Sequence, residues 1–328
     1  MKRMRVFITG ATGFLGGALA CALAQEGAEI HALARAASDR GGLAGVVVHW
    51  HEGDVTVPAS LGNAMAGAEW IVHAAGRLGE FGVNEEVYQQ VHVEGTRNVL
   101  TAALRSGSPA RVLHVSTTGV LGVTSHRPAA EDSPYAPTNP YERAKAAAER
   151  MALEFASQGL PVVICRPAFV YGPGDRHVLR LFQAVRRGRF FLIEGGRRVC
   201  HPTFIADAVA GMLLCLRHGR PGATYQIAGP RPVTFRELAE TIAGALGVSP
   251  PRLALPRWAA TLGAMGLEML GRASGWKPPL SRAGVAFFSE DRCYSWHRAH
   301  DELGYSPEFD LTTGVDRTIA WYRERGWL

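Results

Sequence analysis

Short apolar runs alternate with longer amphipathic segments over the first half of the chain. The runs are rich in β-branched residues and are bounded by turn residues, a pattern that predicts strands. They cover residues 5–9, 29–33, 46–55, 70–76, 111–115 and 161–165. The segments between several of them place apolar residues at helical spacing. Strands alternating with helices predict βαβ units, and therefore an α/β fold with a doubly wound parallel sheet.

The first predicted strand runs directly into a glycine-rich turn. Residues 10–17 read Gly-Ala-Thr-Gly-Phe-Leu-Gly-Gly, and a helical pattern follows as far as Gly27. Glycine lets the backbone approach a pyrophosphate because no Cβ stands in the way. The start of the following helix offers free N–H groups and the positive end of its dipole to phosphates. Strand, turn and helix in this order predict a dinucleotide-binding site.

The ends of the next strands indicate which dinucleotide binds. The second strand ends in Ala34-Arg35, with Arg40 close behind and no acidic residue. An acidic residue there would bond the ribose 2′-hydroxyl of NAD, whereas an arginine accommodates the 2′-phosphate of NADP. NADP is therefore predicted, with NAD as the alternative. Asp54 ends the third strand, where it would meet the adenine edge, and the turn at residues 74–76 is small enough for backbone to pass close to a cofactor.

A capped helix carries a candidate proton-transfer pair. Asn139 suits the N-cap, Pro140 the first helical position and Glu142 the capping-box position, so a helix is predicted from residue 140 to a stop near Gly159. Tyr141 and Lys145 are four residues apart and so share one face of it. A cation beside a phenol favours the phenolate and lowers a pKa that is otherwise near ~10. The spacing alone is equally that of an ordinary surface helix.

Composition narrows the class of protein. The charge of +6 comes from 35 basic and 29 acidic residues without a basic block, which argues against a nucleic-acid partner. The five scattered cysteines argue against disulfides or zinc and favour a reducing compartment, the cytoplasm. No signal peptide precedes the first strand and no uncharged apolar run is long enough to span a bilayer. His49 and His51 could form a metal-binding pair, but their spacing is interpreted as the alternation of side chains along a strand. No metal is expected because no further ligand cluster follows.

Six motifs in order then resemble one family. They are Thr9-Gly-Ala-Thr-Gly-Phe-Leu-Gly16, Gly53-Asp54-Val55, His73-Ala-Ala-Gly76, Ser116-Thr117, Tyr141-x-x-x-Lys145 and Arg166-Pro-Ala-Phe-Val-Tyr-Gly-Pro-Gly174. The set resembles the extended short-chain dehydrogenase/reductases, which include NAD(P)-dependent epimerase/dehydratases, dihydroflavonol reductases and 3β-hydroxysteroid dehydrogenase-like proteins. The tail, Leu303-Gly-Tyr-Ser-Pro307 with a helix at residues 318–321, fits the same family.

The resemblance implies an organisation and a cofactor site. It implies a Rossmann-type dinucleotide-binding domain over residues 1–174, with returns near 204–228, and a smaller C-terminal substrate-binding lobe formed mainly by 175–203 and 229–328. It also implies a homodimer through the predicted helices at 88–104 and 140–155. The implied cofactor-binding residues are Gly10, Thr12, Gly13, Phe14, Leu15, Gly16, Arg35, Asp54, Val55, Ala74, Ala75, Gly76, Tyr141, Lys145 and Pro167, with Tyr171 beside Pro167 at the nicotinamide end.

The resemblance also assigns catalytic roles. Tyr141 would be the general acid/base on the substrate oxygen, and Lys145 would hold the nicotinamide ribose and lower the pKa of the tyrosine. Thr117 would supply the second hydroxyl in place of the commoner serine, with Ser116 as the fallback. These roles imply hydride transfer between a nicotinamide and a hydroxyl or carbonyl carbon of a small molecule.

Three positions depart from the family pattern. The asparagine usual three residues before Gly95-Thr96 is His92, which either substitutes for it in a proton relay or is a satisfied helix residue. Nucleotide-sugar epimerases of the family carry an asparagine where this chain reads Arg166-Pro-Ala-Phe169. They also carry an arginine seven residues before the position of Asp207, which is Cys200 here. The last two departures argue against a nucleotide sugar as the substrate.

The C-terminal third is expected to bind the substrate. Residues 258–270 are unusually apolar, which favours a core helix, with a dimer face or the wall of a lipophilic pocket as alternatives. Phe287 and Phe288 add apolar bulk. A lipophilic alcohol or ketone is therefore the expected substrate. The alternatives are a nucleotide-sugar epimerase or dehydratase with tightly held NAD, and a non-catalytic NADP-binding sensor.

Overall fold

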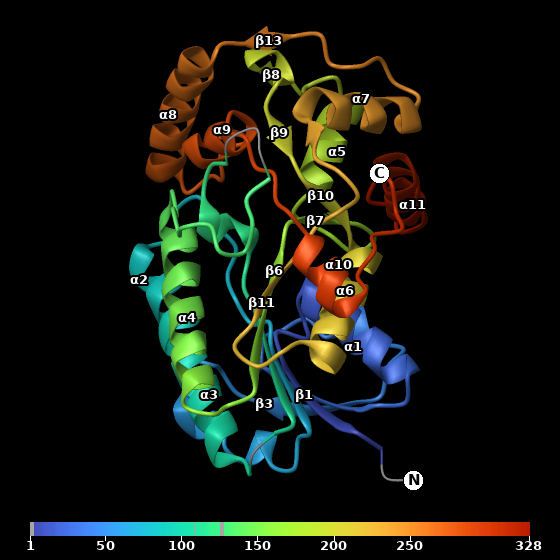
Figure 1. Ribbon diagram of the computed structural model, residues 1–328. Helices are drawn as coiled ribbons and strands as arrows, with labels where there is room; N and C mark the ends of the chain where they lie inside the picture. Colours follow the sequence, from blue (N-terminus) through green and yellow to red (C-terminus); the bar gives the residue numbers. More distant parts are fainter. Residues whose placement is uncertain (1–2, 108, 125–127) are drawn as a thin grey trace.

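A seven-stranded parallel sheet organises the protein, whose computed structural model describes residues 3–107, 109–124 and 128–328 (Figure 1). The strand order is β11-β6-β5-β4-β1-β2-β3. Because β1 lies between β4 and β2, the strand order reverses beside it, which is where doubly wound sheets bind ligands. The strands of this sheet are β1 (Arg5–Thr9), β2 (Glu29–Ala34), β3 (Val48–Glu52), β4 (Trp70–His73), β5 (Arg111–Val115), β6 (Val162–Pro167) and β11 (Thr224–Ile227).

Helices cover both faces of the sheet. The first face carries α2 (Glu85–Tyr88), α3 (Gly95–Arg105) and α4 (Pro140–Ser157), and the opposite face carries α1 (Phe14–Gln25) and α6 (Ile205–His218) (Figure 1). The central strands are almost wholly buried, and two separate apolar layers pack against them, one around Leu19 and Ile30 and the other around Phe7 and Val99. The doubly wound α/β fold predicted from the alternating pattern is confirmed.

Most of the remaining elements gather above the carboxyl ends of the strands, whereas α10 (His297–Leu303) packs against α6 and β11 (Figure 1). They include three two-stranded sheets, formed by β10 with β7, β12 with β9 and β13 with β8. Their strands are β7 (Phe169–Tyr171), β8 (Leu192–Ile193), β9 (Val199–Cys200), β10 (Pro202–Phe204), β12 (Val233–Thr234) and β13 (Ala254–Leu255). Their helices are α5 (Leu179–Arg186), α7 (Phe235–Leu246), α8 (Arg257–Ser274), α9 (Arg282–Phe288), α10 (His297–Leu303) and α11 (Leu311–Glu324).

All six predicted strands are present, but the third is shorter than predicted, at Val48–Glu52. The helix predicted over residues 88–104 is not uniform, because a π-helical turn, η4 (Gln89–Glu94), separates α2 from α3. Such turns often mark functional sites, since the extra residue redirects the side chains around it. The seventh strand, β11, was not predicted from its own sequence pattern.

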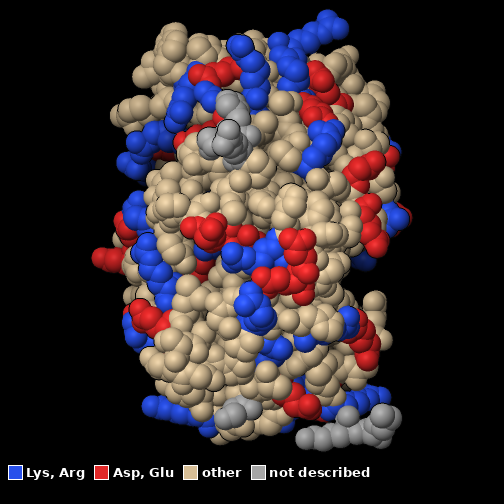
Figure 2. Space-filling model, viewed as in Figure 1, with Lys and Arg blue, Asp and Glu red and all other residues tan. Residues whose placement is uncertain are grey.

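The core position expected for residues 258–270 is wrong for their large side chains. Helix α8 buries Ala260, Ala264, Glu268 and Gly271, most of them small residues that let it pack closely against its neighbour α9. Its large apolar residues, Trp258, Leu262, Met265, Met269 and Leu270, are exposed. Figure 2 shows this part of the molecule, at the upper left, as largely uncharged surface.

A fully buried ion pair fixes α4 to the sheet. Arg166, in β6, donates to the carboxylate of Glu149, in α4, from Nη2 at 2.6 Å and from Nε at 3.0 Å. Ser116 donates its hydroxyl to the same carboxylate at 2.5 Å, and Tyr135 donates its phenol at 2.8 Å. These contacts therefore hold α4 in a defined position relative to the ends of β5 and β6.

We expect Glu149→Gln to lower the free energy of unfolding by about 3–5 kcal/mol, because it leaves the buried guanidinium of Arg166 without its counter-charge. Urea denaturation followed by circular dichroism measures the change. Glu154→Gln, on an exposed part of the same helix, is the matched control and should stay within about 0.5 kcal/mol of the wild type. Equal stability of the two variants would show that the pair does not hold the helix.

Candidate functional site

The glycine turn packs tightly against the end of β4, and its glycines leave the backbone of the turn uncovered by side chains. Gly10 has φ +80°, and a Cβ there would lie 2.5 Å from the carbonyl carbon of Ala74. A Cβ on Gly16 would collide with the carbonyl oxygen of Gly10. No side chain caps α1 at Gly13, so the N–H groups of its first turn remain available. These residues fit an anionic dinucleotide, whose pyrophosphate needs such donors.

A pocket of about 250 Å³ lies at the ends of β2 and β3. Its lining residues are Arg35, Ala36, Glu52, Gly53, Asp54, Val57 and Ser60, so the pocket includes the residues predicted for the adenosine end. Asp54 accepts from the N–H and hydroxyl of Thr56 at 2.9 and 2.8 Å. Within the described parts of the chain, Arg35 forms no ion pair, and its side chain is exposed. The neighbouring Val55 is buried and accepts from the side chain of Asn98.

The structure brings Thr117, Tyr141 and Lys145 together. Asn139 caps α4 by accepting from the N–H of Glu142 at 3.0 Å, and the helix then carries Tyr141 and Lys145 in its first two turns. Thr117 follows β5, and its hydroxyl accepts from the N–H of Gly119 at 3.1 Å and contacts the Tyr141 phenol. Lys145 is buried and donates to the carbonyl oxygen of Val115 at 2.6 Å.

The expected lowering of the Tyr141 pKa by Lys145 is not found. Burial raises the pKa of Tyr141 to about 12, the nearby carboxylate of Glu142 adds to the rise, and the hydrogen bond with Thr117 opposes it. Burial lowers the pKa of Lys145 to about 8. A site with little water disfavours both the phenolate and the ammonium. Tyr141 therefore holds its proton firmly, and Lys145 titrates near neutral pH.

Three buried histidines surround this lysine and stay neutral. Burial and the charge of Lys145 lower the pKa of His73 to about 3 and that of His92 to about 3, and they lower the pKa of His114 as well. His73 is held between the hydroxyls of Thr9, at 2.8 Å, and Thr96, at 3.0 Å. Lys145 is thus the only cationic side chain within this group.

His92 is a hydrogen-bonded residue of the π-helical turn, as the second alternative at this position had it. Its Nε2 lies 2.9 Å from the carbonyl oxygen of Arg77, and its ring meets that of Tyr141 edge-on at 5.4 Å. Tyr88, one turn earlier, accepts from the N–H of Glu80 at 2.9 Å. Both rings therefore hold the loop at residues 77–80, and Gly79 of that loop packs against the side chain of Tyr141. This loop was not predicted from the sequence, where the spacing of Tyr88 and His92 is its local signal.

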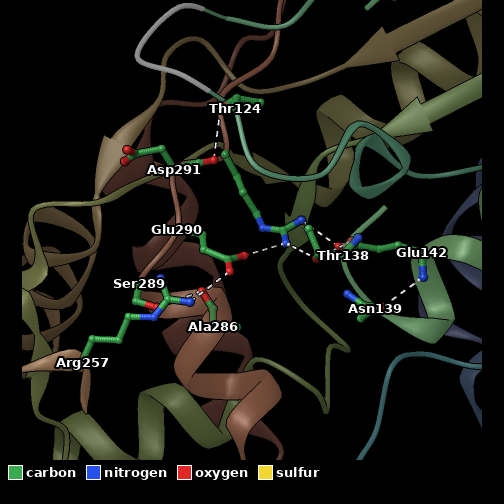
Figure 3. A network of polar contacts seen from close by, with 10 residues as sticks. Thr124, Thr138, Asn139, Glu142, Arg257, Ala286, Ser289, Glu290 and Asp291 are labelled. Carbon is green, nitrogen blue, oxygen red and sulfur yellow. Dashed lines mark hydrogen bonds and ion pairs between the residues drawn. The ribbon is translucent and has the colours of Figure 1, made fainter. Parts of the chain in front are cut away.

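A residue of the C-terminal part reaches the start of α4. Arg292 pairs with Glu142 at 2.7 Å and with Glu290 at 3.1 Å, and both partners of the Glu142 pair are largely buried. Figure 3 shows Glu142, Thr138 and Glu290 turned toward this guanidinium. The second carboxylate oxygen of Glu142 accepts from the N–H of Thr138 at 2.7 Å, rather than from that of the N-cap residue. No residue near Arg292 in the sequence indicates this contact.

Two other predicted residues lie elsewhere. Ser116 turns inward to Glu149, away from Tyr141, so the structure does not favour it as the second hydroxyl. Tyr171 packs under α11, where its phenol meets the carbonyl oxygen of Leu311 at 3.4 Å and its ring meets Phe204. Pro167 is buried at the end of β6. Thr12, Phe14 and Leu15, at the glycine turn, are partly exposed.

The positions that grip a diphosphate in the family's epimerases are differently occupied. Cys200 is buried in β9. Arg198 is paired with Asp291 at 3.1 Å. Neither side chain is therefore available to a sugar diphosphate in the way that an unpaired arginine would be.

His49 and His51 lie on one face of β3, as the alternation predicted, beside Glu29 and His31 of β2. One ligand atom each of Glu29, His31 and His49 lies within 4.8 Å of the others. Arg5 donates to Nδ1 of His31 at 3.1 Å. The Nε2 of His31 therefore carries the ring proton and donates a hydrogen bond to Glu29 at 2.8 Å. These hydrogen bonds engage both ring nitrogens of His31, whereas the half-exposed His49 lies 3.6 Å from Glu29.

Comparisons with known proteins show which chains this protein is similar to. A model described as the NAD dependent epimerase/dehydratase family matches residues 6–228. The chain is 31% identical to a 2-alkyl-3-oxoalkanoate reductase of Stenotrophomonas maltophilia, over 97% of this chain and 99% of that protein. It is 30% identical to a 4-hydroxy-2-methyl-3-oxo-4-farnesyl-3,4-dihydroquinoline-1-oxide ketoreductase of Stigmatella aurantiaca, over 95% of both. Its structure matches the dTDP-glucose 4,6-dehydratase DesIV of Streptomyces venezuelae, solved with NAD, with a TM-score of 0.81, 27% identity and coverage of 99% and 98%.

Among the described residues, no helix has the length and apolar character needed to cross a membrane.

The lowered pKa of Lys145 predicts a pH-dependent stability. Between about pH 8 and the ordinary lysine pKa the unfolded chain binds a proton that the folded chain has lost, so stability rises with pH in this window. Relative to Lys145→Met, the wild type should gain about 2 kcal/mol of stability between pH 7.5 and 9.5 in guanidinium denaturation, because the buried cysteines and tyrosines that titrate with the opposite sign are common to both proteins. Lys277→Met, at an exposed lysine, should show the same pH dependence as the wild type. An equal gain in Lys145→Met and wild type would refute the assignment.

Proposed function

Because the chain belongs to the NAD dependent epimerase/dehydratase family, and so is an NAD(P)-dependent enzyme of the extended short-chain dehydrogenase/reductase type, we propose that it is an NADP-dependent ketoreductase acting on a lipophilic small molecule. The observation that carries the proposal is the meeting of Thr117, Tyr141 and Lys145 at the carboxyl edge of the sheet, beside the bare glycine turn.

In the reducing direction each side chain has one task. The bound nicotinamide supplies the hydride that reaches the carbonyl carbon. Tyr141 is protonated at physiological pH because its pKa is raised to about 12, so its phenol donates the proton to the carbonyl oxygen. The hydroxyl of Thr117 donates to the same oxygen and holds it beside the phenol. Lys145 donates to the ribose hydroxyls and fixes the nicotinamide end.

The preference for NADP is supported by Arg35. Its guanidinium is exposed at the 250 Å³ pocket and has no carboxylate partner within the described segments, so it is available to a 2′-phosphate. Arg40, by contrast, stacks over the ring of Trp50 at 5.0 Å. Asp54 and Val55 would border the adenine. The residues Gly10, Gly13, Gly16, Ala74, Ala75, Gly76 and Pro167 would complete the cofactor site.

A lipophilic substrate is supported by the residues above the sheet. Phe169, just after β6, packs against Phe287 of α9 at 5.3 Å, and Phe287 in turn meets Phe235 at 5.4 Å. The names of the two reductase relatives also give ketone substrates with alkyl or farnesyl chains. The second candidate is a nucleotide-sugar dehydratase or epimerase with tightly held NAD, which the likeness to DesIV favours. The buried Cys200 and the paired Arg198 disfavour it.

The organisation of the enzyme completes the proposal. Residues 1–174 and 204–228 form the cofactor domain, and 175–203 and 229–328 mainly form the substrate lobe. Two copies pair through α3 and α4, as is usual in this family, and the enzyme works in the cytoplasm. A non-catalytic sensor is disfavoured because it would not need all three of Thr117, Tyr141 and Lys145.

Tyr141→Phe should lower turnover of a long-chain 3-oxo ester with NADPH by about 10³-fold, since it removes the proton donor, while NADPH binding stays within about threefold. Thr117→Ala should lose about 10²-fold and Thr117→Ser should recover most of it. Thr312→Ala, at an exposed threonine of α11, is the matched control and should keep its turnover. Steady-state kinetics and fluorescence titration measure both quantities. Turnover of dTDP-glucose instead of the ketone, or purification with NAD bound, would establish the second candidate.

Arg35→Ala should weaken NADPH binding about tenfold or more without changing the affinity for NADH, because it removes the charge that faces the 2′-phosphate. Arg40→Ala is the control and should leave the ratio of the two affinities near the wild-type value. Isothermal titration with both cofactors measures this ratio. Tighter binding of NADH than of NADPH by the wild type would overturn the preference.

A further inference from the structure

Helix α8 is built with its large apolar side chains outward. Trp258, Leu262, Met265 and Met269 recur at helical spacing along one face, and their exposed fractions are 69%, 60%, 43% and 71%. The face toward the protein carries Ala260, Ala264 and Gly271 instead. A surface helix of a globular protein has the opposite arrangement, with large residues in and polar residues out.

Basic side chains outnumber acidic ones around this stripe, five to three when Glu80 and Glu290 are counted with Glu268. Residues 251–282 contain five basic residues, Arg252, Arg257, Arg272, Lys277 and Arg282, and one acidic residue, Glu268. All five basic side chains are exposed, whereas Glu268 is buried and paired with Arg282 at 2.8 Å. Exposed pairs to Glu290 and Glu80 offset Arg257 and Lys277 in part. In Figure 2 blue side chains stand beside the uncharged surface over α8.

We propose that this face of α8 docks on an anionic lipid surface. An apolar stripe flanked by arginine and lysine is the composition of helices that lie in a membrane interface, with the apolar face among the acyl chains and the basic groups among the headgroups. Trp258 at one end and the exposed Trp276 just beyond the other are residues that favour this interface. The stripe runs from Trp258 to Met269 of this helix and so extends over roughly 17 Å.

The charge excludes a second copy of the chain as the better occupant. A symmetric pair would place the same patch on both sides, so the basic residues of one copy would face those of the other. An anionic surface instead complements them. A lipid surface also suits a single convex helix, which offers no groove for a peptide.

The docking face lies next to the candidate site. A Cβ on Gly271 would lie 3.5 Å from the ring of Phe81, and Lys277 pairs with Glu80 at 3.3 Å. Phe81 and Glu80 directly follow Gly79, and Gly79 packs against Tyr141. Docking would therefore bring the bilayer close to the active site, where a lipophilic substrate dissolved in it can enter. This last step rests on the proposed function, whereas docking itself does not.

The test is co-sedimentation of the full chain with large vesicles of phosphatidylcholine alone or with 30% phosphatidylglycerol. We expect binding to the anionic vesicles, at least tenfold weaker binding to the neutral ones, and loss of binding in 0.5 M NaCl. Leu262→Gln/Met269→Gln and Arg257→Gln/Arg272→Gln should each weaken binding at least tenfold.

Val47→Gln, at an exposed apolar residue outside α8, is the control and should bind as the wild type does. Circular dichroism confirms that each variant is folded, and none of these substitutions touches the candidate catalytic residues. The proposal is overturned if the wild type binds neither kind of vesicle, or if the α8 variant binds like the control. It is also overturned if ultracentrifugation shows a dimer that Leu262→Gln/Met269→Gln dissociates. Sedimentation needs no turnover, so a failed ketoreductase assay leaves its result interpretable.

Discussion

The buried pair of Arg166 and Glu149 is the constraint on which the candidate site depends. Glu149 stands eight residues after Tyr141 and four after Lys145, so all three lie along one face of α4. Its carboxylate takes the hydroxyl of Ser116 as well as the guanidinium of Arg166. Successive side chains beyond a strand point in opposite directions, so anchoring Ser116 inward turns Thr117 toward the phenol of Tyr141. One carboxylate thereby sets the helix, the strand end and the second hydroxyl.

Burial then decides where the protons are. With water largely excluded, the phenol of Tyr141 keeps its proton and the histidines around Lys145 stay neutral. Glu149 opposes the loss of charge from Lys145, although burial outweighs it. The free protein therefore presents a protonated acid beside an amine that titrates near pH 8. This is the state needed for reduction, in which the substrate oxygen must receive a proton.

The sequence was sufficient where the determining contacts are local. The glycine turn, the cap at Asn139 and the spacing of Tyr141 and Lys145 each depend on residues within one turn, and the structure has them as predicted. It was insufficient where contacts join distant segments. Arg292 meets Glu142 across 150 residues, and nothing near either one indicates the pairing. The pattern in α8 showed an apolar helix but not which face packs, because the small residues and not the large ones make the contact.

The ion pairs between α8 and α4 differ in strength along their length. Arg257 of α8 meets Glu290 at 3.4 Å, Glu290 meets Arg292, and Arg292 meets Glu142 at the start of α4 (Figure 3). The outer pair is half exposed and contributes little to the stability of the fold. The inner pair is largely buried, so losing one of its partners would strongly destabilise the fold. The start of α4 therefore depends on the inner pair of Arg292 and Glu142, and loss of the outer pair leaves the position of Tyr141 unchanged. Helix α8 itself is fixed by other contacts, among them the ion pair of its buried Glu268 with Arg282 at 2.8 Å.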